Sequence, residues 1–95
     1  MLKSQVDGLD PAHGWWVPVV VSPERDWPGA PGCRRGARFL VDSVTLRASR
    51  NAFEPFESRV GCMEWIMRHR TELNAALPRA QVRAVRLDRW LLGLD

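Results

Sequence analysis

The longest periodic stretch of the chain runs from Pro55 to Leu77. Its apolar residues recur at spacings of three and four, which places them on one stripe of a 3.6-residue period. This stripe contains Phe56, Val60, Met63, Ile66, Met67, Leu73 and Leu77. The pattern predicts one long amphipathic helix with the stripe as its core face. Asn51 and Glu54 fit a capping box before it, and Pro78 disfavours the α conformation at Leu77, where the helix should end.

The opposite side of this predicted helix carries charged residues and one tryptophan. Its solvated positions are Glu57, Glu64, Arg68 and Glu72. Trp65 falls among them, Gly61 lies one turn earlier and leaves a notch beside the indole, and His69 follows one turn later. Either a loop or the N-terminal arm of the same chain covers Trp65, or Trp65 contacts another molecule.

Two stretches before the helix have the composition of strands. Trp15 to Ser22 is mostly β-branched or aromatic, and Pro18 within it favours a sheet edge or a bulge because proline lacks the backbone donor. We expect Val17 and Val19 to face the helix, with Trp16 and Val20 facing away. Ala37 to Ser49 alternates but changes phase at Asp42 and Ser43, which we interpret as a bulge, with a tight hairpin as the alternative.

The segment after the helix is compatible with two structures. As a strand, Arg79 to Leu87 completes a small β-β-α-β domain of the α+β class, in which an antiparallel three-stranded sheet packs on one long helix and Asp88 to Gly93 forms a short helical turn. As a helix, it forms a helix-turn-helix-like pair with an arginine row on one face. We prefer the strand, with residues 1–14 as a flexible N-terminal arm and residues 15–95 as a single domain.

Composition and charge limit the function classes. The 95 residues suffice for one core, and 45% hydrophobic with 26% charged residues is typical of a globular protein. A net charge of +3 permits a polyanionic partner without requiring one. Two cysteines suit a reducing compartment, and no stretch approaches the roughly 20 apolar residues of a membrane span, so we expect a cytoplasmic protein with no membrane segment.

The residues that carry catalytic or metal chemistry are few and scattered. His13, Cys33, Cys62 and His69 show no paired ligand spacing. On a helix, Cys62 and His69 would be about 10.5 Å apart along the axis, too far for a nucleophile and its base. We therefore expect no enzyme activity, no metal, no cofactor and no small-molecule substrate.

The remaining functions are binding functions. Tryptophan and arginine dominate interface hot spots, and the predicted helix and loops carry several outside an obvious core. The first hypothesis is a protein-binding module, a small adaptor or inhibitor or a homodimer, that uses Trp65, Gly61, Arg68, His69, Trp16 and Trp27.

The second hypothesis is a nucleic-acid-binding accessory protein, in which arginines contact phosphates and Trp27 or Trp90 stacks on bases. Its candidate residues are Arg34, Arg35 and Arg38 in the loop after the first strand, or the C-terminal row Arg79, Arg83, Arg86 and Arg89. We rank it second because the net charge is low.

Overall fold

The sheet is built around the strand β1 (Trp16–Val21), which has the most hydrophobic sequence of the chain. The computed structural model describes residues 14–50 and 54–93. In these residues, β1 pairs antiparallel with β2 (Arg38–Val41) on one side and with β4 (Val82–Arg86) on the other. The short β3 (Ala48–Ser49) pairs with β2, which gives the strand order β3-β2-β1-β4. The protein is therefore a small α+β domain with an antiparallel sheet, as predicted.

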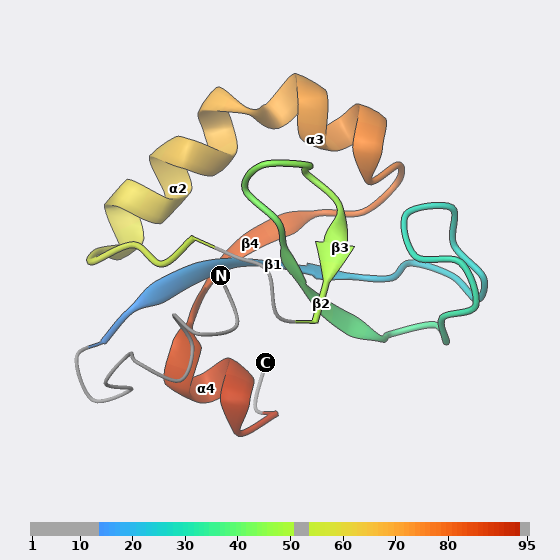
Figure 1. Cartoon of the computed structure of the whole chain (residues 1–95), viewed down its shortest axis with the longest axis horizontal. Helices are drawn as coiled ribbons and strands as arrows, with labels where there is room; N and C mark the ends of the chain where they lie inside the picture. Colours follow the sequence, from blue (N-terminus) through green and yellow to red (C-terminus); the bar gives the residue numbers. More distant parts are fainter. Residues whose placement is uncertain (1–13, 51–53, 94–95) are drawn as a thin grey trace.

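Helices cover both faces of this sheet (Figure 1). The helices α2 (Arg59–Arg68) and α3 (Arg70–Ala76) follow one another across one face. The short helix α4 (Leu87–Leu91) continues directly from β4 and lies at the other face. The described part of the chain thus has three layers, where the sequence predicted two.

Each face of the sheet carries its own buried cluster. The cluster on the α2 and α3 side consists of Val20, Trp27, Phe39, Val41, Leu73 and Leu77. The cluster on the α4 side consists of Val17, Val19, Leu40, Val85 and Leu87, with Trp15 and Trp90 packed against it. The predicted orientation of β1 is therefore wrong, because Val20 faces the long helices while Val17 and Val19 face α4.

Pro18 lies in a central strand, and not at the edge that its missing donor predicts. Trp16 exchanges both backbone hydrogen bonds with Phe56, at 2.8 Å each. Backbone groups alternate sides along a strand, so those of Pro18 and Val20 point the same way as those of Trp16. Pairing with β2 begins only at Val19. Pro18 therefore lies between the Phe56 bridge and the β2 ladder, where its missing N–H breaks no ladder bond.

The second predicted strand divides into β2 and β3 at a loop of residues 42–47, so the bulge interpretation is wrong, and the hairpin that forms is longer than the tight one of the alternative. The Asp42 carboxylate accepts hydrogen bonds from the N–H groups of Val44 and Thr45, at 2.8 and 3.3 Å. The Asp42 and Leu46 backbones close the turn, and Leu46 adopts a positive φ of 58°. The loop is longer than two residues, so Asp42 and Ser43 need not match the sequence signal of a two-residue hairpin. The Asp42 side chain organises this longer loop. The sheet consequently has four strands and not three.

The predicted long helix is two helices, and it begins later than expected. Pro55 and Phe56 are not helical, and the N-cap of α2 is Ser58, whose Oγ accepts a hydrogen bond from the Gly61 N–H at 3.0 Å. His69 leaves helical geometry with φ −103° and ψ 15°, which separates α2 from α3. Of the predicted capping box, Asn51 lies outside the described residues.

The C-terminal segment forms the predicted strand and short helix, which excludes the helix-turn-helix alternative. Of the predicted N-terminal arm, residues 1–13 lie outside the described part of the chain. Within the described residues, no helix has the length and apolar content that crossing a membrane requires.

Candidate functional site

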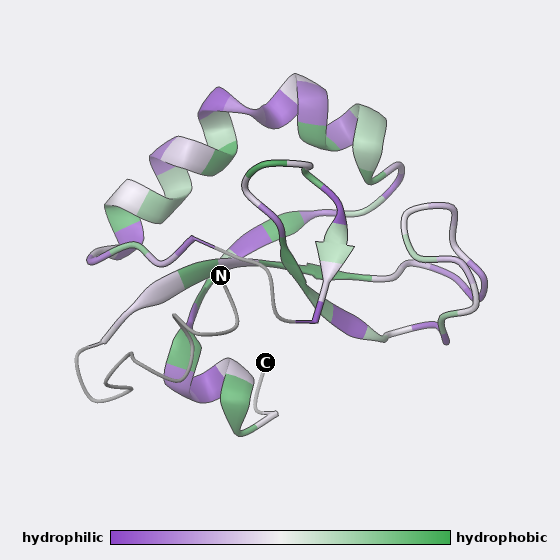
Figure 2. Ribbon diagram, viewed as in Figure 1, coloured by the Kyte–Doolittle hydropathy of each residue, from purple (hydrophilic) through white to green (hydrophobic). Residues whose placement is uncertain are grey.

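The outer side of α2 exposes apolar side chains that the sequence assigned to the core. Val60, Met63 and Met67 are 64%, 41% and 71% exposed. Their predicted burial is wrong, because α2 turns Cys62 and Ile66 towards the sheet in their place. Figure 2 shows hydrophobic and hydrophilic residues alternating along α2 and α3. In α2, the exposed Met63 and Met67 and the buried Cys62 place apolar residues on both the outer and the inner side.

The neighbouring strand β4 lies at the end of the sheet and leaves one backbone edge open. The Leu87 N–H donates to the Trp15 carbonyl at 2.8 Å, so the backbone of Leu87 faces β1. By alternation, the backbones of Arg83 and Val85 also face β1, whereas those of Val82 and Ala84 face outward. Among the described residues, no other strand pairs with this edge.

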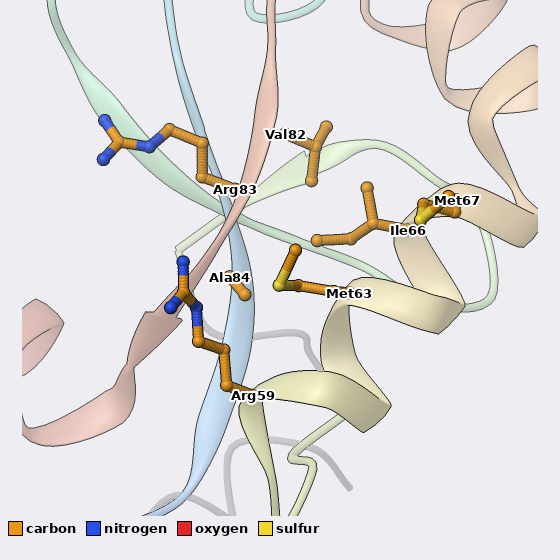
Figure 3. Close-up of a pocket in the computed structure, with 7 residues that line it drawn as sticks. All are labelled: Arg59, Met63, Ile66, Met67, Val82, Arg83 and Ala84. Carbon is orange, nitrogen blue, oxygen red and sulfur yellow. The ribbon is translucent and has the colours of Figure 1, made fainter.

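A groove runs between the outer side of α2 and β4 (Figure 3). It encloses a cavity of about 330 Å³, lined by Arg59, Met63, Ile66, Met67, Val82, Arg83 and Ala84. Figure 3 shows Met63 and Ile66 reaching from the helix towards Val82 and Ala84 on the strand. The helix and the strand thus both bring apolar side chains to the groove, and one wall is a strand edge that pairs with no other strand of the described residues.

The charge at this groove is positive. Arg59 lies at the start of α2 and Arg83 on β4, and both are exposed. Neither forms an ion pair in the described part of the chain, whereas Arg79 pairs with Glu24 and Arg86 with Asp88. The first turn of α2 contains no acidic residue, so the positive end of the helix dipole adds to the Arg59 charge.

Trp65 packs within its own chain. Its ring centroid lies 6.0 Å from that of Phe56 and 4.6 Å from that of His69, and it packs against the cluster below α2 and α3. The His69 Nδ1 atom lies 2.8 Å from the Trp65 carbonyl oxygen. A Cβ on Gly61 would lie 3.2 Å from the Ser58 Oγ, so this glycine accommodates the helix cap. Trp65 thus lies on the inner side of α2, and its predicted place among the exposed charges is wrong.

The other predicted protein-binding residues are dispersed. Trp27 is fully buried and its indole N–H donates to the Pro78 carbonyl, so its predicted exposure is wrong. Trp16 is half-buried in β1, where it pairs with Arg86 and Phe56. Arg68 is exposed at the end of α2.

The arginines proposed to contact nucleic acid form no single row. Arg34 and Arg35 are exposed in the loop before β2. Arg38 is half-buried in β2, and its Nε and Nη2 atoms have no hydrogen-bond partner among the described residues. In the C-terminal segment, Arg79 precedes β4, Arg83 and Arg86 lie in it, and Arg89 lies in α4, so the helical row does not form.

Burial of Cys62 and the dispersion of metal-ligating side chains limit the chemistry available to these groups in the described residues. Burial raises the pKa of the Cys62 thiol to about 12, which keeps the nucleophilic thiolate scarce near neutral pH. Across residues 14–50 and 54–93, no three His, Cys, Asp or Glu side chains gather in a way that could hold a metal ion.

The groove is the feature that sequence reasoning missed. Its apolar residues were assigned to the core, and Arg59 was not singled out. The available signal was the apolar residues on more than one side of the Pro55 to Leu77 segment, since a helix on a small sheet can bury only one of them. Comparisons with protein-family models, curated proteins and solved structures gave no significant match.

Proposed function

We propose that this chain is a non-enzymatic protein-binding module, a small adaptor or inhibitor, that binds its partner through the groove between α2 and β4. The observation that carries this proposal is the combination of exposed Met63 and Met67 with the open edge of β4 at one cavity. Methionine side chains adapt to irregular partners, and an exposed strand edge offers backbone hydrogen bonds to another chain.

This site replaces the one that the sequence indicated. Trp65 and Trp27 are held by contacts within the chain, so they stabilise the domain and position α2. Arg68 and His69 remain near the far end of α2, outside the groove lining. The function class stays the same as the first sequence hypothesis, while the residues that carry it change.

The nucleic-acid hypothesis has less support. A strand occupies the segment that a recognition helix would need, and the C-terminal arginines consequently form no single row. Arg34 and Arg35 remain candidate phosphate contacts, which a salt series with generic DNA and RNA would test.

A photo-crosslinking amino acid tests the proposed site directly. We expect p-benzoylphenylalanine in place of Met67 to form a discrete adduct with one protein in the cells that produce this chain. The same amino acid in place of Val44, which is 84% exposed at the hairpin, serves as a matched control and should form none. Adding Met63→Glu should abolish the adduct, because a carboxylate would lie among the apolar side chains of the groove.

Two results would contradict the proposal. Identical adducts from positions 67 and 44 would indicate nonspecific capture, and the absence of an adduct at 67 would remove the groove as a binding site. An adduct of twice the chain's mass would identify a second copy as the partner.

A further inference from the structure

We propose that the occupant of the groove is an extended segment of another protein, which alternates acidic and apolar residues and adds to β4 as a further strand. This inference rests on the proposed function and specifies the chemistry of the partner. It follows from three properties of the groove: the direction of its backbone groups, the two faces of β4, and its charge.

The backbone of β4 favours an extended occupant. The outward-facing N–H and C=O groups of Val82 and Ala84 repeat at the two-residue period of a strand. A helix satisfies its own backbone groups, so only an extended chain can pair with this row. The occupant therefore binds first through backbone hydrogen bonds, which fix its register against β4.

The two faces of β4 determine which side chains the occupant needs. Val82 is opposite Val20 and Ala84 is opposite Pro18, so both lie on the α2 face of the sheet. Arg83 is opposite Val19 and lies on the α4 face. Figure 3 shows the Arg83 side chain directed away from the helix. Alternate residues of an added strand therefore meet Met63 and Met67 on one face and Arg83 on the other.

The charges favour an acidic occupant over a second copy of the chain. Arg59 and Arg83 have no ion-pair partners in the described residues, and the groove lining contains no acidic residue. A second copy offers no carboxylate from its own β4, and antiparallel pairing with Arg83 opposite Arg83 would place two like charges together. Carboxylates facing Arg83, with one near Arg59 at the start of α2, complement this charge.

A random library of displayed seven-residue peptides tests the proposal without knowledge of the partner. Peptides are selected on the wild-type chain and depleted on the Met67→Glu variant, which blocks the groove. We expect the enriched sequences to alternate apolar and acidic residues. Enrichment of apolar residues at spacings of three and four would identify a helical occupant and overturn the proposal, as would basic residues or no enrichment at all.

A charge exchange tests the contact with Arg83. Arg83→Glu should weaken binding of a selected peptide by about tenfold or more, which corresponds to one lost charged pair. Arg35→Glu changes the net charge equally on an exposed loop outside the groove, and it should leave affinity within about twofold. Replacing the peptide's acidic residues by lysine should restore binding to Arg83→Glu. Equal effects of the two variants would contradict the assigned contact.

Backbone methylation separates strand addition from other modes of binding. Only alternate N–H groups of an added strand point to β4, so N-methylation of one set should abolish binding while methylation of the other set leaves it. Equal loss from both sets would overturn strand addition. If position 67 still crosslinks to a partner that lacks an alternating acidic segment, the occupant is wrong while the proposed function stands.

Discussion

Cys62 shows how burial alone sets the chemistry of a residue. Its side chain is fully buried on the inner side of α2, and this burial raises the thiol pKa from its ordinary value of 9.0 to about 12. The unfolded chain releases the proton from about pH 9, whereas the folded chain retains it to about pH 12. The free energy of unfolding therefore decreases as the pH rises through this window, because the unfolded state binds fewer protons.

Urea unfolding of the Cys62→Ala variant between pH 8 and pH 11 tests this assignment. We expect the variant to be less stable than wild type at pH 8, because a buried group is lost, but to lose less further stability as the pH rises. Parallel pH profiles for wild type and Cys62→Ala would show that Cys62 does not contribute to the pH dependence.

Trp27 holds the loop of residues 22–37 onto the domain. Its indole is fully buried, donates to the Pro78 carbonyl, and leaves no room for a side chain on Gly29, where a Cβ would lie 2.6 Å from the ring. We expect Trp27→Phe to cost about 2 kcal/mol of unfolding free energy, since it removes a buried hydrogen bond and part of a packed ring. Trp90→Phe on the half-buried α4 tryptophan should cost less than half as much in the same urea titration. Equal losses would contradict the anchoring role of Trp27.

The position of Trp27 could not be predicted from its neighbours in the sequence. The surrounding prolines and glycines correctly predict a loop, but its hydrogen-bond acceptor lies 51 residues away. Trp65 presents the same difficulty, because its burial depends on Phe56 pairing with Trp16 before the helix begins. The sequence identified both tryptophans as unusual. Only the tertiary contacts show that each packs against other residues of its own domain.

At the level of elements, the start of α2 determines which residues face outward. The periodicity of Pro55 to Leu77 correctly predicted a helical region. The capping box proposed at Asn51 and Glu54, however, would start the helix earlier than the observed start of α2 at Arg59. Phe56 forms a bridge to β1, so the chain stays extended until Ser58 caps α2. Leu73 of α3 is buried, because it follows the inward-facing Ile66 by seven residues and so keeps to the same side, whereas Met63 and Met67 stay exposed.

We expect removal of the Ser58 cap to destabilise the domain by about 1 kcal/mol, because Ser58→Ala leaves a donor of the first turn unsatisfied. Ser58→Asp should retain most of the stability, since a carboxylate also accepts a hydrogen bond from the Gly61 N–H and is attracted to the positive end of the helix dipole. Thermal or urea unfolding of the two variants checks this. An alanine variant as stable as the aspartate variant would show that Ser58 does not cap α2.

The strands were easier to predict than their arrangement. The β-branched composition of β1 and the alternation in β2 identified both correctly, and the preferred strand at the C-terminus is β4. The order β3-β2-β1-β4 could not be predicted, because Pro18 favours an edge when only local chemistry is considered. The gap between the Phe56 bridge and β2 accommodates this proline in the centre of the sheet.

At the level of the whole molecule, the sheet order creates the candidate site. With β1 in the centre, β4 lies at one end of the described sheet, and α2 crosses above it with apolar side chains exposed. Neither a strand edge nor an exposed helix face alone distinguishes a binding site from ordinary surface. The proposed peptide-binding function rests on the groove where the two meet, beside two arginines that form no ion pair with any described residue.

Amide hydrogen exchange along β4, measured by NMR residue by residue, tests this account most directly. In the free protein we predict slow exchange at Arg83 and Val85, which face β1, and fast exchange at Val82 and Ala84, which face outward. Addition of a peptide selected on the groove should slow Val82 and Ala84 and leave the amides of β2 unchanged. Uniform protection along β4 in the free protein would mean that its edge is already paired, and unchanged exchange after peptide binding would contradict strand addition.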